Sequence, residues 1–404
     1  WLENTLVIID PCLNPDGYSR YTHWYRNVAP KNADPSPWVR EHLEPWPGGR
    51  VNHYHFDLNR DWAWKTQKES QLRSERYLDW LPHIHADVHE QGYNSPYYFA
   101  PAAKPFHEYI TDWQGEYQTE IGKNHTKYFD SNGWLYFTRE RFDLLYPSYG
   151  DTYPTFHGSI GMTYEQAGHS RAGRAILTET GDTLTLDDRV THHATTSLST
   201  VEVASRDADR IVKNFGEYFQ QADNPPGKYK TFVIKPGDAP KRLAALTKLL
   251  DKNRIEYGYA TNNQGGRGYS YLTGKSEDFT LEKGDLVVSA HQPLGVFAQV
   301  LLEPQTMLED SVTYDITAWS LPYAYGLPAF ALTSKNSFST STNKPAVSGF
   351  KRPESLPYAY MAEWTSVADA AFLGDLLEAE VRVRYALEPI GVEGKEFASG
   401  TLVM

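Results

Sequence analysis

The amino-acid sequence predicts an α/β protein with two domains. Short apolar runs typical of buried strands alternate with longer segments in which apolar residues recur at helical spacing. A length of 404 residues suits two or three domains of about 100–200 residues each. The breaker cluster Asn224-Pro225-Pro226-Gly227 marks the best boundary, so we expect domains at about 1–223 and 228–404.

The first domain is expected to contain strands and helices in alternation. Residues 6–9 form a continuous apolar run that indicates a buried strand. A helix is expected around 64–81, followed by a short strand at 84–89, where apolar and polar residues alternate. The last helix of this domain is expected at 205–222. Because the chain enters directly on an uncovered core strand, we expect it to be a piece of a longer protein.

The second domain shows the same alternation, which indicates a parallel sheet. The expected strands are 232–234, 255–260, 286–288, 381–387 and 400–404, and the expected helices are 238–252, 293–302 and 368–380. This order resembles a flavodoxin-like or class-I glutamine-amidotransferase-like domain. The domain contains no cysteine, which excludes an amidotransferase nucleophile, and we expect a structural or substrate-positioning role. The glycine-rich stretch 265–268 is expected to be a flexible surface loop, because no helix follows it as a phosphate cradle would require.

Composition excludes several classes of protein. The chain carries 39 Lys and Arg against 51 Asp and Glu, a net charge of −12, which argues against a nucleic-acid partner. No apolar run reaches the length of about 18 residues that a membrane-spanning helix requires. A single cysteine, Cys12, excludes an internal disulfide framework, and we expect its small side chain to be buried.

Five short segments carry the residues that could perform chemistry. They are Asn14-Pro15-Asp16-Gly17-Tyr18, Trp24-Tyr25-Arg26-Asn27, Asp57-Leu58-Asn59-Arg60-Asp61-Trp62, Asp87-Val88-His89-Glu90-Gln91-Gly92 and Ser159-Ile160-Gly161-Met162-Thr163-Tyr164-Glu165-Gln166. Each segment alone has an ordinary explanation, such as turn chemistry or a surface ion pair. Their order and spacing together resemble the zinc carboxypeptidase family, in its large bacterial branch with a C-terminal α/β domain, over about residues 6–175. The resemblance implies a carboxypeptidase-like α/β/α mixed sheet and a secreted or periplasmic bacterial protein.

The same resemblance implies hydrolysis of a peptide or small amide next to a free carboxylate, assisted by one zinc ion. His89 matches a zinc ligand of the family, a role that neutral imidazole suits. Glu165 matches the general base and proton shuttle, and Arg26 matches the arginine that polarises the scissile carbonyl. Asn59 and Arg60 match the pair that binds the terminal carboxylate, for which the planar arginine fork is suited.

The family also has a mobile tyrosine upstream of its catalytic glutamate. Tyr146, Tyr149 and Tyr153 are candidates, and we choose Tyr149 because a glycine follows it. Asp151 in the same loop could select a basic terminal residue, but we prefer a solvated loop aspartate.

The metal site departs from the family pattern. The family's other two zinc ligands lie in a His-x-x-Glu motif, and this sequence contains none. His85 and His89 lie on one face of the predicted strand, but their Cα atoms would be about 13 Å apart, which is too far for both side chains to bind one zinc ion. We therefore expect the remaining ligands upstream of Trp1. Among the other histidines, we expect His42, His157 and His169 in loops or on the surface.

Two alternative functions stay open. One is a metal-dependent deacylase of N-acyl amino acids, which a narrow pocket would favour. The other is a non-catalytic pseudo-peptidase that binds carboxylates through Arg60.

Overall fold

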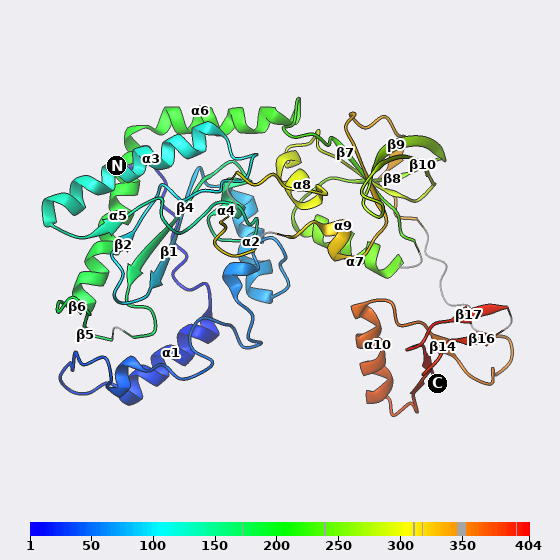
Figure 1. Ribbon diagram of the computed structural model, residues 1–404, viewed down its shortest axis with the longest axis horizontal. Helices are drawn as coiled ribbons and strands as arrows, with labels where there is room; N and C mark the ends of the chain where they lie inside the picture. Colours follow the sequence, from blue (N-terminus) through cyan, green and yellow to red (C-terminus); the bar gives the residue numbers. More distant parts are fainter. Residues whose placement is uncertain (172, 238–239, 310–311, 317, 346–352, 393) are drawn as a thin grey trace. The chain divides into compact units, whose positions relative to one another are not determined.

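The computed structural model describes residues 1–404 except 172, 238–239, 310–311, 317, 346–352 and 393 (Figure 1). Helices and both parallel and antiparallel strand pairs are present, so the protein is of the predicted α/β class. Two compact units are formed. The first comprises Trp1–Lys230, Asp251–Ile255 and Ala290–Ser320, and the second comprises Thr231–Leu250, Glu256–Ser289 and Leu321–Met404. The chain first passes between the units close to the breaker cluster at 224–227, but the return of 290–320 to the first unit has no local signal in the sequence.

The first unit is built on a sheet with the order β1-β4-β2-β3. Strands β1 (Ile84–Gln91) and β4 (Ile160–Ala167) are parallel neighbours over their full lengths. Strand β2 (Tyr97–Tyr98) pairs with β4 in the antiparallel sense and with β3 (Tyr136–Phe137) in the parallel sense. All eight residues of β4 are buried, so this strand is the centre of the unit.

Helices cover both faces of this sheet. On one face lie α3 (Asp112–Asn132), α5 (Leu186–Arg206) and α6 (Ala208–Phe219), which contribute to an aromatic-rich core with the even-numbered residues of β4. On the other face, Tyr77 of α2 (Lys68–Trp80) contacts His85 of β1 edge to face. The alternation of side chains along a strand produces this division, because successive residues point to opposite faces.

Two predicted elements near the N-terminus differ from the structure. Residues 6–9 have no strand conformation, and Leu6 and Ile9 are 70% and 79% exposed, so the predicted buried strand is wrong. None of the described strands pairs with this run, and an apolar run forms a strand only where a partner accepts its backbone hydrogen bonds. The Asn-Pro-Asp-Gly segment begins α1 (Pro15–Val28), where Asn14 Oδ1 accepts a hydrogen bond from Gly17 N at 2.9 Å and proline occupies the first turn.

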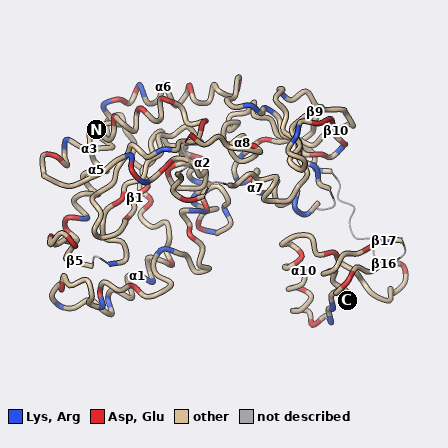
Figure 2. Tube along the Cα trace, viewed as in Figure 1, with Lys and Arg blue, Asp and Glu red and all other residues tan. Residues whose placement is uncertain are grey.

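The helix predicted at 205–222 is interrupted at Asp207, so its residues are divided between α5, α6 and a final 3-10 turn. The remaining elements of the first unit are short. They are η1 (Arg40–His42), η2 (Leu58–Arg60), α4 (Thr152–Thr155), β5 (Ala175–Leu177), β6 (Thr183–Thr185), η3 (Gln220–Ala222) and α8 (Gly295–Leu302). Among the described helices, none is long and apolar enough to cross a membrane. Lys and Arg are interspersed with Asp and Glu along the chain trace of this unit (Figure 2).

The second unit contains a seven-stranded sheet with the order β10-β9-β12-β7-β11-β8-β13. The strands are β7 (Thr231–Ile234), β8 (Gly258–Ala260), β9 (Gln264–Ser270), β10 (Ser276–Leu281), β11 (Leu286–Ser289), β12 (Ala329–Leu332) and β13 (Thr340–Ser341). Every pairing described in this sheet is antiparallel, which corrects the predicted parallel, flavodoxin-like arrangement. The connection from β9 to its sheet neighbour β10 is too short for the crossover helix that a parallel pair needs.

The glycine-rich stretch 265–268 lies in β9 and is not the surface loop that we predicted. A Cβ atom on Gly266 would lie only 2.6 Å from the ring of Phe279 on the paired strand β10. A side chain at this position would require the Phe279 ring to move.

Smaller elements complete the second unit. Helix α7 (Pro240–Lys252) lies mostly in this unit, and α9 (Leu321–Ala324) and α10 (Val367–Glu378) belong to it. A three-stranded sheet has the order β14-β18-β15, and β16 pairs with β17. These strands are β14 (Met361–Ala362), β15 (Arg384–Tyr385), β16 (Ile390–Val392), β17 (Lys395–Phe397) and β18 (Leu402–Val403). The two strands predicted at 381–387 and 400–404 are therefore present but shorter.

Candidate active site

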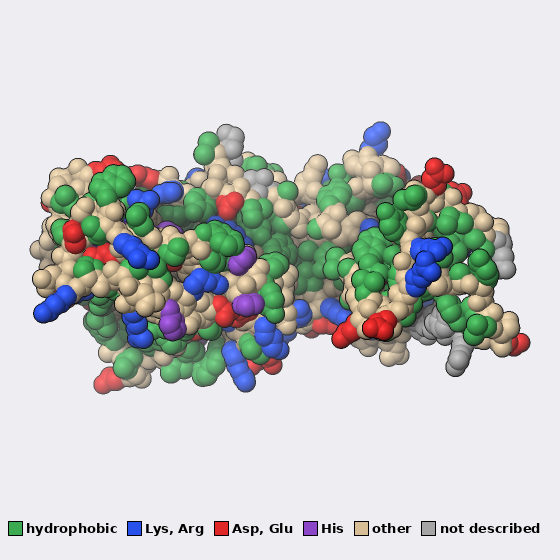
Figure 3. All heavy atoms as spheres, turned by 90° about the horizontal axis from the view of Figure 1, so that it is seen from below, with side chains coloured by type: hydrophobic (Ala, Val, Ile, Leu, Met, Phe, Trp, Pro, Cys, Tyr) green, Lys and Arg blue, Asp and Glu red, His purple; other side chains and the backbone are tan. Residues whose placement is uncertain are grey.

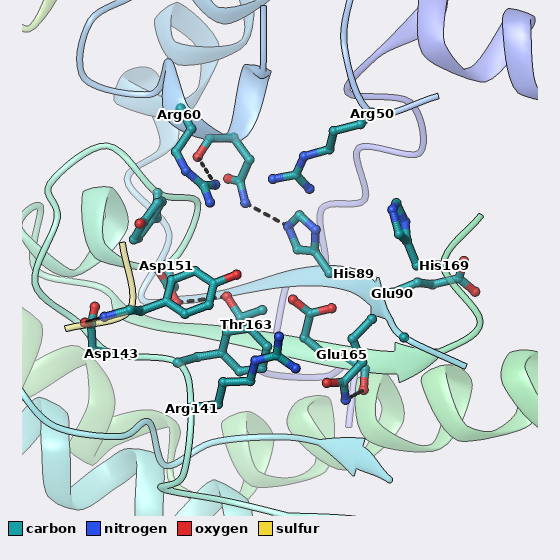
Figure 4. A pocket seen from close by; sticks show the side chains of 16 residues that line it. Arg50, Arg60, His89, Glu90, Arg141, Asp143, Asp151, Thr163, Glu165 and His169 are labelled. Atoms are coloured by element: carbon teal, nitrogen blue, oxygen red, sulfur yellow. Dashed lines mark hydrogen bonds between the residues drawn. The ribbon is translucent and has the colours of Figure 1, made fainter. Parts of the chain in front are cut away.

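The parallel register of β1 and β4 brings two predicted site residues together. His89 pairs directly with Glu165 near the C-terminal ends of the two strands. Both are odd-numbered, so both side chains point to the face opposite the aromatic core, as Figure 4 shows. The C-terminal ends of parallel strands are where α/β proteins place their ligand sites.

A cavity of about 320 Å³ opens at this edge of the sheet. Its lining includes five of the six predicted site residues: Asn59, Arg60, His89, Tyr149 and Glu165. The other lining residues are Arg50, Glu90, Gln91, Gly92, Arg141, Phe142, Asp143, Asp151, Thr163, His169 and Tyr314. Histidine and basic side chains are visible together on the surface of the first unit in the space-filling view (Figure 3).

Glu165 has the properties of a proton carrier. The residue is buried, and its Oε2 atom has no hydrogen-bond partner among the described residues. Burial raises the pKa of Glu165 from 4.5 to about 7, although the charge of His89 opposes this shift. A carboxyl group with a pKa near neutrality can both accept and return a proton under ordinary conditions.

His89 is held by a carboxylate and an amide. Its Nε2 atom lies 2.6 Å from Asp87 Oδ2 and 3.0 Å from Asn59 Nδ2. Although burial favours the neutral acid, the charge of His89 lowers the pKa of Asp87 to about 2, so Asp87 is ionised. The ionised oxygen at the shorter distance favours a proton on Nε2 that is donated to Asp87. With that proton in place, the amide nitrogen of Asn59 contacts the same ring nitrogen and does not donate a hydrogen bond to it. Burial lowers the pKa of His89, but the charge of Asp87 outweighs it and the pKa is raised.

Asn59 is fixed by hydrogen bonds to its carbonyl oxygen. Its Oδ1 atom accepts from Gly150 N at 2.8 Å and from Trp62 Nε1 at 3.1 Å, so its amide nitrogen faces His89. The preceding Asp57 caps the 3-10 turn η2 by accepting from Asn59 N at 2.9 Å. The turn thereby holds Asn59 and Arg60 on the rim of the cavity.

Arg60 lies over an aromatic ring and is paired with a carboxylate. Its guanidinium carbon is 4.3 Å from the centre of the Tyr149 ring. Its Nε and Nη2 atoms are each 3.0 Å from Asp315 Oδ2. Of the three candidate tyrosines, Tyr149 lines the cavity, whereas Tyr153 is fully buried against Trp62.

Arg26 is the predicted site residue that the structure does not bring to the cavity. It lies on the exposed side of α1 and is not among the lining residues. Two other arginines line the cavity instead, Arg50 and Arg141, and our sequence analysis missed both. Arg50 is held by Asp57, with Nε and Nη2 each 3.0 Å from Asp57 Oδ2. No local pattern marks either arginine, because their placement depends on how long loops fold back over β1 and β4.

Asp151 also corrects a prediction. It is buried and lines the cavity, and it is not a solvated loop residue. Its Oδ2 atom accepts a hydrogen bond from Thr163 Oγ1 at 2.8 Å, while burial raises the pKa of Asp151 to about 6.

Two histidines that we expected in loops or on the surface are buried, and the predicted burial of Cys12 is wrong. His42 and His157 are fully buried, and each has a backbone carbonyl within hydrogen-bonding distance of its Nδ1 atom. Cys12 is exposed, because the run that precedes it is not packed as a strand.

The described residues contain no group of three His, Cys, Asp or Glu side chains arranged to hold a metal ion. His89 is the one predicted zinc ligand in this chain, and a single imidazole does not fit the three protein ligands that catalytic zinc requires. The zinc ion therefore stays a prediction, and the chemistry below is derived from the protein's own groups.

Comparisons with protein-family models, with curated proteins and with solved structures find no match. The resemblance to zinc carboxypeptidases thus stays a prediction from the motifs.

Proposed function

We propose that the first unit hydrolyses a peptide or small amide bond that lies next to a free carboxylate. One observation carries the proposal. The pairing of β1 with β4 puts Glu165, a buried carboxyl group with a pKa near 7, into the same cavity as three arginines that can bind a carboxylate.

Arg60 and Asn59 would bind the substrate carboxylate. A guanidinium group matches a carboxylate with two parallel hydrogen bonds, and the Tyr149 ring lies 4.3 Å from the guanidinium carbon of Arg60. Burial disfavours the charged form of Arg60, but neighbouring groups outweigh this effect and raise the pKa of the guanidinium. Arg60 therefore keeps the positive charge that this role requires.

Glu165 would move the proton. Its carboxylate would accept a proton from the water that attacks the amide carbonyl, and it would return this proton to the amine nitrogen as the carbon–nitrogen bond breaks. Arg50 and Arg141 line the same cavity and can stabilise the negative oxygen that develops in the intermediate. Asp87 would hold the His89 imidazole in one orientation throughout.

The size of the cavity favours a small substrate. About 320 Å³ lies at the lower end of the range of about 300–1,000 Å³ for ligand sites. We therefore include, as a second candidate, the deacylation of N-acyl amino acids, in which the amino acid supplies the free carboxylate.

The test is an assay of hydrolysis with matched substrates. N-acyl amino acids and short peptides would be compared with their C-terminal amides, each with and without added zinc. We expect turnover of the free acids only, and its loss by a factor of about 10²–10⁴ in Glu165→Gln. Glu116→Gln is the control, because Glu116 is exposed on α3.

Three results would contradict the proposal. Unchanged turnover in Glu165→Gln would remove Glu165 from the mechanism. Equal turnover of acids and amides would remove the carboxylate site. Binding of free acids without turnover under any condition would favour a non-catalytic binding module instead.

A further inference from the structure

The arginine that would bind the substrate carboxylate already has a carboxylate partner within the first unit. Asp315 Oδ2 lies 3.0 Å from both Nε and Nη2 of Arg60, and the two residues are 255 positions apart in the sequence. Both side chains retain partial solvent exposure, 25% for Arg60 and 39% for Asp315. A pair at this depth is accessible to a ligand that enters the cavity.

The segment that carries Asp315 is anchored on the wall of the cavity. The backbone nitrogen of Tyr314 donates a hydrogen bond to Asp143 Oδ2 at 2.7 Å. The Tyr314 ring packs against Phe142 and Tyr149, with ring centres 5.2 and 6.3 Å apart. Asp143, Phe142 and Tyr149 all line the cavity, so these contacts direct the 312–316 segment to this site.

The position of Asp315 makes it chemically equivalent to the substrate group. Its Oδ2 atom accepts a hydrogen bond from Nε and forms an ion pair with Nη2, on the edge of the guanidinium that the planar fork offers to a carboxylate ligand. The Tyr149 ring lies 4.3 Å from the guanidinium carbon of Arg60, so both the ring and the charge that would recognise a ligand are engaged. A substrate carboxylate cannot occupy this edge until Asp315 leaves it.

We propose that Asp315 is a built-in competitor for Arg60, which weakens the binding of free carboxylates and so selects substrates able to displace it. This inference rests on the proposed function, because it assumes that Arg60 is the carboxylate site. Ligands with a neutral end, such as amides, gain nothing from displacing Asp315 and would be unaffected by its charge.

The test is the binding of two probes measured by titration calorimetry. N-acetyl-phenylalanine carries the carboxylate, and N-acetyl-phenylalaninamide is its neutral counterpart. An aromatic side chain suits a cavity wall that contains Phe142, Tyr149 and Tyr314. The variant Asp315→Asn removes the charge and keeps the shape, and it should bind the acid about threefold to tenfold more tightly, because partly exposed ion pairs are modest in strength. Its affinity for the amide should not change.

The matched control is Glu309→Gln. Glu309 forms an exposed ion pair with Lys104 close to the same segment and does not line the cavity. Its removal should leave both affinities at the wild-type value.

A second measurement uses the unmodified protein, in case Asp315→Asn fails to fold. Saturating N-acetyl-phenylalanine should speed hydrogen exchange of the Tyr314 amide severalfold, because displacement of Asp315 loosens the segment, and the amide probe should leave this rate unchanged.

Each outcome decides between the two proposals. Equal affinity of wild type and Asp315→Asn for the acid, with no change in exchange, would overturn the competitor role while the carboxylate site stands. Equal tightening of acid and amide would show a steric effect and would also overturn it. Failure of both proteins to bind the acid would overturn the proposed function and the competitor role with it.

Discussion

The two faces of the β1–β4 strand pair differ in the free energy that they contribute to folding. The face with even-numbered residues packs Ile160, Met162 and Tyr164 into the aromatic core, where all three are almost completely buried. The opposite face buries Asp87 and Glu165, and their burial disfavours the charged forms of both carboxylates. One face of the same strands therefore stabilises the fold, and the other carries polar groups whose burial is costly unless they are paired. The cavity lies on the second face, where the pKa values of buried carboxyl groups are shifted, and such shifts are common at functional sites.

The largest effect is expected from a cavity in the core face. Met162→Ala removes a buried side chain and should lower the free energy of unfolding by about 2–5 kcal/mol. The loss would be measured by urea denaturation followed by tryptophan fluorescence. Ligand affinity at the cavity should be retained. If the free energy of ligand binding changed by more than the free energy of unfolding, the separation of the two faces would be contradicted.

The next effect has the opposite sign and lies on the polar face. The folded protein holds the pKa of Glu165 at about 7, above its ordinary 4.5, so the folded state binds this proton more tightly than the unfolded state. The stabilising contribution of the protonated form is complete below about pH 4.5 and is lost as the pH rises through 7. At pH 8 Glu165→Gln should therefore raise the free energy of unfolding by up to about 3 kcal/mol, since each pKa unit corresponds to about 1.4 kcal/mol.

The check is to measure the stability of wild type and Glu165→Gln at pH 5 and pH 8. The difference between the two proteins should be small at pH 5 and large at pH 8. A difference that is independent of pH would show that the carboxyl group of Glu165 is not the source.

A smaller loss is expected from Asp87→Asn. Burial disfavours the ionised form of Asp87, but His89 lowers its pKa to about 2, below the ordinary 3.8. This carboxylate contributes stability above about pH 3.8, and the contribution disappears as the pH falls through 2. The variant should lose about 2 kcal/mol at pH 7 and lower the pKa of His89, which NMR titration would report. An unchanged His89 pKa would mean that Asp87 does not orient the ring.

The smallest effect serves as a reference outside both faces. Asn14 caps α1 with its side-chain oxygen, so Asn14→Ala should cost about 1 kcal/mol in the local stability of this helix. Hydrogen exchange of the α1 amides would measure it. Equal loss of protection in β4 would show that α1 unfolds together with the sheet.

The sequence alone determined the features that depend on short-range patterns. The alternation at 84–89 predicted β1 and the face on which His89 lies, because side chains alternate along any strand. The order of the motifs identified Asn59, Arg60, His89, Tyr149 and Glu165, and all five line one cavity. The α/β class followed from the same patterns.

The tertiary structure alone decided the features that depend on contacts between distant segments. It placed Arg50 and Arg141 at the cavity and left Arg26 on an exposed helix, and it joined Asp315 to Arg60 across 255 residues. It also made the second sheet antiparallel. Periodicity shows which face of an element is buried, but it does not show which distant segment covers that face. Charged side chains on loops have no periodicity, so their partners are set only when the chain folds.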